Sequence, residues 1–236
     1  MVPLHLIHLH QVPVFEQLQL EEALLRADQR NWCLLNTGTE PAIVLGISGN
    51  PAELIHEQER QKHQVPMIRR FSGGGTVVVD QSTCFVTFIF NQESLPIEPF
   101  PAPILRWTEK LYQPLFAGLD FNLRENDYTI GHLKCGGNAQ YLTKGRWLHH
   151  TTFLWDYAPH LMECLTLPKK TPTYRQQRPH SDFLCKLKDH LPLNTPQEFL
   201  HSIQQHLNIL FKIQPIPHTT AQQLLNLPHR KSTKII

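Results

Sequence analysis

Glycine is scarce in this chain and is concentrated at two places. The 236 residues contain only 11 glycines, yet five of them fall in the runs Gly73–Gly75 and Gly136–Gly137. Glycine adopts backbone conformations that other residues avoid and lets another group approach the main chain closely. A chain that uses glycine so selectively needs bare backbone at these two positions. We therefore expect both runs to border one ligand-binding cavity.

The charge and apolar content indicate an ordinary globular protein. Lys and Arg number 22 against 20 Asp and Glu, and this formal charge of +2 excludes a polybasic binder of nucleic acids or membrane surfaces. Hydrophobic residues make up 41% of the chain, and no apolar run approaches the roughly 20 residues of a membrane helix. Met1–His10 has no Lys, Arg or cleavage site, so it predicts a strand rather than a signal peptide.

The apolar patterns predict an α+β fold with mixed, mainly antiparallel sheets flanked by helices. A helix is expected at Val14–Arg30, and Asn50-Pro51 begins a capped helix that runs to about residue 63. The β-runs Thr76–Asp80 and Cys84–Phe90 are separated by three residues, which favours a hairpin. Leu119–Tyr141 predicts a pair of strands around its central glycine.

The C-terminal part completes one predicted catalytic domain over residues 1–236. Within residues 186–236 the pattern predicts helix, strand and helix. Thr195-Pro196 starts the first of these helices with a cap, Phe211–Ile216 is the strand, and Thr220–Leu227 is the last helix.

The cysteines stand singly, and no CxxC pair occurs. Their odd number argues against a disulfide framework or a zinc ribbon and predicts a cytoplasmic, reducing location. His5, His8 and His10 have no His or Cys partner at ligand spacing, so they predict no metal site. The five cysteines are Cys33, Cys84, Cys135, Cys164 and Cys185.

The first glycine run carries groups suited to anions. In the stretch Arg69–Thr76, successive bare backbone N–H groups can face an anion. Arg70 adds a permanent planar charge that suits carboxylate or phosphate, and Ser72 adds a hydroxyl. The stretch matches neither GxxxxGK[ST] nor a GxGxxG that opens a helix. The alternative explanation is a flexible hairpin turn without a ligand.

The second glycine run is preceded by oxygen donors and a lysine. Asn126 and Asp127 carry oxygens that suit Mg²⁺ and the polar groups of a nucleotide. Lys134, beside bare backbone, can neutralise a carboxylate and an α-phosphate as charge builds in an in-line attack. Taken one at a time, these residues are better explained by an ordinary turn. Their coincidence with a second glycine run favours a site.

Several segments, in order along residues 14 to about 157, resemble lipoate–protein ligase A and its relatives. The later stretch from Leu167 to Cys185 also looks like one branch of this superfamily. The matching segments are Gln17–Leu25, similar to the family's first helix; Gly46–Pro51, similar to GRxQNP; Arg69–Asp80, similar to RRxSGGGxVxxD; Asn126-Asp127 with Lys134–Ala139, similar to ND…K(x)SGxA; and His149–Leu154, similar to HHGTLL.

The resemblance implies a fold shared with biotin protein ligases and class II synthetase cores, and a reaction in two halves. Lipoate or octanoate reacts with ATP to give an acyl-adenylate and pyrophosphate. The acyl group then passes to a lysine ε-amine. The implied acceptors are lipoyl domains of 2-oxoacid dehydrogenase E2 subunits or the glycine cleavage H protein.

The resemblance also implies a role for each matching residue. Lys134 is implied as the catalytic residue, which holds the carboxyl and phosphate oxygens. Asn126 and Asp127 are implied as Mg²⁺ ligands. The residues implied to bind ATP are Arg70, Gly75, Thr76, Val77, Val78, Asn126, Asp127 and Lys134. The residues implied to bind lipoate are Ser72, Gly73, Gly74, Lys134, Gly137, Asn138, Ala139 and His149.

Three departures from the family pattern bear on function. Ile47 stands where the family usually carries arginine, so one anion contact is missing or comes from elsewhere. Thr151 replaces the glycine of HHGT, and its side chain leaves less room for a group to approach the backbone there. The family's separate C-terminal accessory domain is expected to be absent, so either adenylation needs a partner chain or the protein performs only transfer.

Two other activities stay open. An octanoyl- or lipoyl-transferase of the same fold works without ATP through a cysteine thioester, with Cys164 or Cys135 as the nucleophile. A non-catalytic acyl or nucleotide binder would keep the cavity without turnover. A biotin ligase is disfavoured, because its GRGRxGR loop is absent from the chain.

Overall fold

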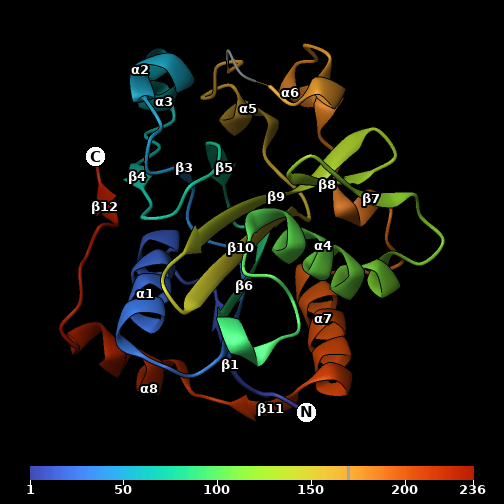
Figure 1. The fold of residues 1–236 in the computed structure, drawn as a ribbon. Coiled ribbons are helices and arrows are strands. Elements are labelled where there is room, and N and C mark those ends of the chain that lie inside the picture. Colours follow the sequence, from blue (N-terminus) through green and yellow to red (C-terminus); the bar gives the residue numbers. More distant parts are fainter. Residues whose placement is uncertain (169–170) are drawn as a thin grey trace.

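The protein consists of two β-sheets with helices around them, as a computed structural model describes it for residues 1–168 and 171–236 (Figure 1). The large sheet has eight strands in the order β11-β1-β2-β6-β10-β9-β8-β7, and the small sheet has four in the order β12-β4-β3-β5. The strands are β1 Pro3–His10, β2 Trp32–Thr37, β3 Ala42–Leu45, β4 Met67–Arg69, β5 Val77–Val79, β6 Thr83–Asn91, β7 Phe121–Arg124, β8 Asp127–Ile130, β9 Leu133–Leu142, β10 Arg146–Leu154, β11 Lys212–Pro215 and β12 Lys234–Ile235.

The helices lie mostly between and outside these sheets. No helix in the described ranges is long and apolar enough to cross a membrane. The α-helices are α1 Val14–Ala27, α2 Pro51–Leu54, α3 Glu57–Lys62, α4 Pro101–Tyr112, α5 Pro159–Met162, α6 His180–Phe183, α7 Pro196–Leu210 and α8 His218–Gln222. The 3₁₀ turns are η1 Gln92–Ser94, η2 Gln113–Phe116, η3 Thr173–Arg175, η4 Leu187–Asp189 and η5 Gln223–Asn226.

Both sheets mix strand directions. Strand β1 runs parallel to β2 and to β11, whereas the pairs from β2 through β6, β10, β9 and β8 to β7 are antiparallel. In the small sheet β3 is parallel to β4 and antiparallel to β5, and β12 adds antiparallel to β4. The predicted α+β class with mainly antiparallel pairing is confirmed.

The large sheet is covered on both faces because its strands alternate their apolar side chains. In β1, Leu4 and Leu6 join one core with α4 and α7, while Ile7 and Leu9 join another core with α1. Successive side chains of a strand point to opposite faces, so this alternation buries both sides of the sheet. Figure 1 shows α1 on one side of the sheet and α4 and α7 on the other. The N-terminal half of α1 also packs on the small sheet through Val14 and Leu18.

The predicted hairpin at residues 76–90 is wrong. Strand β5 pairs with β3 in the small sheet, whereas β6 lies inside the large sheet between β2 and β10. Both edges of β6 are therefore already occupied. Asp80 closes the short connection by accepting hydrogen bonds from the backbone of Ser82 and Thr83. The chain thus changes sheets directly after the first glycine run.

Three other expectations need correction in extent. Helix α1 ends at Ala27 rather than at residue 30, and the helix predicted from Asn50 is two short helices, α2 and α3. Between them Ile55 leaves the helical path and bridges to Leu165. The stretch 119–141 forms three strands, β7 to β9, rather than two. The predicted cap at Thr195 is confirmed, since its hydroxyl accepts from the Glu198 N–H at 3.2 Å.

Candidate functional site

The first glycine run and Gly137 of the second border one cavity of about 1110 Å³ between the sheets. The Gly73 N–H donates to the carbonyl of Gln140 on β9 at 3.2 Å, so the first run lies against the strand that carries the second. Of the predicted site residues, those that line the cavity are Arg70, Gly73, Gly74, Gly75, Thr76, Val77, Asn126, Asp127, Lys134, Gly137, Asn138 and Ala139.

The two arginines of the first run hold backbone in shape. Arg70 Nη2 donates to the carbonyls of Gly73 at 3.2 Å and Gly75 at 2.8 Å. Arg69 Nη1 donates to the Gly49 carbonyl at 2.7 Å and so closes the preceding turn. Gly74 has a φ of +118°, a conformation that only glycine adopts freely. Arg70 therefore acts first as a clamp that shapes the loop, although it also borders the cavity.

Lys134 faces the loop from β9 and pairs with a buried carboxylate. Its Nζ lies 2.8 Å from Asp127 Oδ1, and the Tyr174 hydroxyl donates to the other oxygen, Oδ2, at 2.9 Å. The Lys134 side chain keeps 20% of its surface exposed, which leaves the ammonium accessible from the cavity. A Cβ at Gly137 would lie only 3.2 Å from Nζ, so bare backbone at Gly137 gives the lysine its room.

Part of the cavity wall is apolar and continuous. Val14, Leu18, Val44, Val79 and Phe85 all line the cavity, and all five belong to one buried cluster between α1 and the small sheet. The cavity therefore combines an ammonium, exposed loop backbone and an apolar surface. This combination suits a ligand with a long apolar chain and an anionic head.

Three predicted site residues lie elsewhere. Ser72 is buried, and its carbonyl accepts from the Ile47 N–H at 3.0 Å, so the residue supports the loop from behind. Val78 points into the core of the small sheet, since its neighbours on β5 take the cavity side. His149 does not line the cavity, and this expectation is corrected: its neighbour His150 does.

The two histidines differ because adjacent strand residues face opposite sides of the sheet. His149 is buried on the α4 side, with its Nδ1 3.0 Å from Gln140 Nε2. His150 faces α1, with Nδ1 2.9 Å from Oε1 of the fully buried Glu21. Burial would raise the pKa of Glu21, but the His150 charge and the hydrogen bonds that the carboxylate accepts hold it below its usual value. Neither Glu21 nor His150 was predicted as a site residue from the sequence.

Acid should destabilise the protein through His149. Burial, with a smaller contribution from His150, lowers the pKa of His149 to about 3. In the unfolded chain a histidine titrates near 6.5, so between these values the unfolded state binds one proton more. This histidine should therefore cost roughly 1.4 kcal/mol of stability for each pH unit of acidification below about 6.

Urea unfolding at pH 7, 6 and 5 checks this expectation. His149→Gln should lose this part of the pH dependence, whereas His201→Gln, a matched change on the exposed face of α7, should keep it. An identical pH slope in His149→Gln and the unchanged protein would contradict the assignment.

No cysteine among the described residues lines the cavity. Cys135 is fully buried and donates to the Tyr128 carbonyl, and burial raises its pKa well above the usual value. Cys164 is buried in the core beside the small sheet, and burial, with the charges of Glu59 and Glu163, raises its pKa too. A raised pKa opposes the thiolate that a nucleophilic cysteine needs.

The segment from Thr171 to Cys185 forms another part of the wall and also escaped assignment from sequence. Thr171, Pro172, Arg175, His180 and Phe183 all line the cavity. A signal was present, because the stretch from Leu167 to Cys185 resembles one branch of the superfamily. Nothing in the sequence indicated which of these side chains turns toward Lys134.

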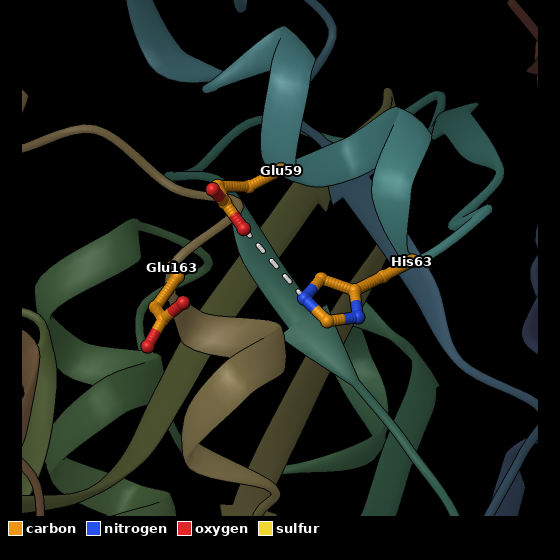
Figure 2. Close-up of side chains that lie close together, drawn as sticks. All are labelled: Glu59, His63 and Glu163. Atoms are coloured by element: carbon orange, nitrogen blue, oxygen red, sulfur yellow. Dashed lines mark ion pairs between the residues drawn. The ribbon is translucent and has the colours of Figure 1, made fainter.

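Outside the cavity, one cluster in the described ranges has the composition of a metal site. Figure 2 shows Glu59 on α3 and His63 directly after α3, near Glu163, which follows α5. One ligand atom from each of the three residues lies within 4.8 Å of the others. Lys62 Nζ already lies 2.8 Å from Glu59 Oε2, and none of the three residues lines the cavity. We assign no role to this cluster.

Comparison with known families gives one extended match. Residues 13–208 match the family profile described as lipoyl protein ligase A/B catalytic domain. The chain is 26% identical to the inactive lipoate–protein ligase 2 of Plasmodium falciparum over 86% of this chain and 69% of that protein. It is 30% identical to lipoate-protein ligase LplJ of Bacillus subtilis over 64% of this chain and 46% of that protein. The chain thus spans about half to two thirds of these relatives.

Solved structures show the same fold at low sequence identity. A bi-partite lipoate protein ligase from Thermoplasma acidophilum, studied with its E2 lipoyl domain, superposes with a TM-score of 0.74 at 18% identity and covers 96% of this chain and 93% of that chain. A lipoate-protein ligase A bound with ATP superposes with a TM-score of 0.73 at 17% identity, over 95% of this chain and 94% of that chain.

Proposed function

This chain belongs to the lipoyl protein ligase A/B catalytic-domain family, and from that premise we propose that it is an ATP-dependent lipoate–protein ligase. In the first step a carboxylate oxygen of lipoate or octanoate attacks the α-phosphorus of ATP, the bond to the β-phosphate breaks, and pyrophosphate leaves. In the second step a lysine amine attacks the acyl carbon, the bond to AMP breaks, and the amine loses a proton. No side-chain nucleophile is needed, only charge neutralisation and positioning.

One observation carries the proposal: the Lys134 ammonium, the glycine loop and an apolar wall border the same cavity. We assign to Lys134 the carboxyl and phosphate oxygens of the reactants. The loop backbone at Gly73–Val77 and the strand backbone at Gly137–Ala139 would lie along the nucleotide and the acyl head. Val14, Leu18 and Phe85 would receive the acyl chain.

The Mg²⁺ expected at Asn126 and Asp127 fits these residues poorly. Both carboxylate oxygens of Asp127 already have a partner: Oδ1 pairs with the Lys134 ammonium, and Oδ2 accepts a hydrogen bond from the Tyr174 hydroxyl. Mg²⁺ is usually held through one or two available carboxylates together with substrate phosphates. We therefore assign no step to a metal held by this pair.

A pyrophosphate-exchange assay tests the proposed function. The purified chain should incorporate labelled pyrophosphate into ATP only when lipoate or octanoate is present. Mass spectrometry of an added lipoyl domain should then show one acyl group on its lysine. Exchange without acyl substrate, or none with either acid, would reject the ligase assignment for the chain acting alone.

The transferase alternative has a direct test in the cysteines. Because Cys164 and Cys135 lie outside the cavity wall, Cys164→Ser and Cys135→Ser should retain acyl-adenylate formation and lipoyl transfer within about twofold, normalised to folded protein. Loss of transfer in either correctly folded variant, with a thioester on that cysteine in the parent protein, would favour the transferase.

A second candidate, a ligand binder without turnover, is favoured by one comparison, since the Plasmodium relative carries the name inactive. Tight lipoate and ATP binding without pyrophosphate exchange would indicate it. Exchange restored by a second polypeptide would instead indicate a ligase that needs a partner chain, and the Thermoplasma neighbour carries the name bi-partite. The acceptors we propose are lipoyl domains of 2-oxoacid dehydrogenase E2 subunits or the glycine cleavage H protein. The buried, unpaired cysteines support a reducing, cytoplasmic setting.

A further inference from the structure

Arg175 is a buried guanidinium with an unused nitrogen in the cavity wall. Only 5% of the residue is exposed, it lines the cavity, and its Nη2 is buried without a hydrogen-bond partner among the residues that the structure describes. A buried charged N–H without an acceptor costs more free energy than a neutral one, and such groups in folded proteins usually have a partner. The missing acceptor is therefore a reason to look for a ligand.

The guanidinium is held rigidly in place. Arg175 Nε donates to the Arg178 carbonyl at 3.0 Å, and Arg178 Nε donates back to the Arg175 carbonyl at 3.0 Å. The Phe183 ring lies beneath the charge, 4.6 Å from the guanidinium carbon to the ring centroid. A cation fixed in this way loses little conformational freedom when an anion binds.

The segment that carries Arg175 is fastened to the Lys134 strand. The Cys185 N–H donates to the Lys134 carbonyl at 2.9 Å, and the Tyr174 hydroxyl donates to the same Asp127 that pairs with Lys134. Between these attachments lies His180, whose pKa falls to about 4 through burial and the charges of Arg175 and Lys134. Both cations therefore border the same part of the cavity.

The other arginine of the wall has both terminal nitrogens in use, and its buried nitrogen without a partner among the described residues is Nε. Arg70 gives Nη1 to the Val44 carbonyl and Nη2 to the carbonyls of Gly73 and Gly75. Ile47, at the position where the family signature carries arginine, offers no charge. The terminal nitrogen of Arg175 is thus available where these two positions are not.

We propose that Arg175 binds a phosphate group of the nucleotide, together with Lys134, and so supplies an anion contact that the turn at Ile47 lacks. A phosphate spreads its charge over several oxygens and can engage a planar guanidinium and an ammonium at once. A carboxylate has two oxygens, which a single cation can satisfy. This inference rests on the proposed function, because it takes ATP as the ligand.

Calorimetric binding of ATP, adenosine and lipoate to Arg175→Gln tests the inference. The Kd for ATP should rise about 10- to 100-fold, whereas the Kd values for adenosine and lipoate should stay within about twofold. Arg106→Gln, the same change on the exposed face of α4, should leave all three unchanged. A merely structural role for Arg175 would weaken adenosine and lipoate as well.

The possible results distinguish a failure of the proposed function from a failure of the Arg175 contact alone. If the unchanged protein binds no ATP, the proposed function fails and the inference with it. If it binds ATP and Arg175→Gln binds ATP equally well, or loses lipoate affinity instead, the inference alone is wrong. If Arg175→Gln does not fold, Arg175→Lys decides: an ATP affinity at least threefold weaker at unchanged adenosine affinity supports the contact, and an unchanged ATP affinity overturns it.

Discussion

Replacing Lys134 by alanine is expected to lower acyl-adenylate formation by about 10²- to 10³-fold while the protein stays folded. The ammonium lies beside the bare backbone at Gly137 and shares the cavity with the glycine loop, so its removal takes away a positive charge that would compensate developing phosphate and carboxylate charge. Asp127 keeps the hydrogen bond from Tyr174, which limits the effect on stability. Lipoate-dependent pyrophosphate exchange measures the loss, and circular dichroism reports the fold.

Lys144→Ala is the matched control for this experiment. Lys144 is an exposed lysine in the turn between β9 and β10, and its loss removes the same charge without touching the cavity. Pyrophosphate exchange by Lys144→Ala should stay within twofold of the parent. Near-normal exchange by a folded Lys134→Ala would refute the assignment of the cavity as an adenylation site.

Replacing Gly74 by valine is expected to weaken both lipoate and ATP binding at least tenfold and to destabilise the fold. The φ of +118° disfavours any side chain, and strain of this kind costs roughly 1–3 kcal/mol. The new Cβ would also lie 2.6 Å from Arg70 Nη2 and 3.1 Å from the Asn138 carbonyl oxygen. The valine would therefore push the loop away from both its clamp and the facing strand. Calorimetric binding and urea unfolding measure the two effects.

Gly75→Ala separates backbone strain from loss of a loop glycine. A Cβ at Gly75 would meet no atom within 4 Å, and the φ of Gly75 lies outside the left-handed region. The unfolding free energy of Gly75→Ala should therefore stay within about 0.5 kcal/mol of that of the parent protein. Unchanged lipoate and ATP affinity in a folded Gly74→Val would show that the loop does not border the ligands.

The sequence predicted which segments border the cavity better than which single side chains point into it. The first glycine run, Gly137 of the second, Lys134 and the Asn126-Asp127 pair line it, because glycine spacing and a charge beside bare backbone are local signals. The sequence did not show to which face of a sheet an individual residue of a strand points. Val78 and His149 were assigned to the site, yet each faces a core, since one residue along a strand reverses the face.

Contacts between distant segments lay beyond the sequence. Glu21 on α1 and His150 on β10 are 129 residues apart, and only folding brings the carboxylate within 2.9 Å of the imidazole. Likewise, three residues between β5 and β6 are compatible with a hairpin or with a change of sheet. The choice depends on which strands already occupy both edges of β6, and this is a property of the whole sheet.

The sequence alone therefore predicted the local features of the protein. It indicated where the backbone has to be free of side chains, where helices begin, and which lysine lies beside glycine. The tertiary structure alone decided which charges share a cavity and which are used to hold loops. Arg70 and Arg175 are the same residue type, but Arg70 gives both terminal nitrogens to backbone carbonyls, while Nη2 of Arg175 has no partner in residues 1–168 and 171–236. The reason is physical, since the free energy of a buried charge depends on the acceptors around it, and distant parts of the chain supply them.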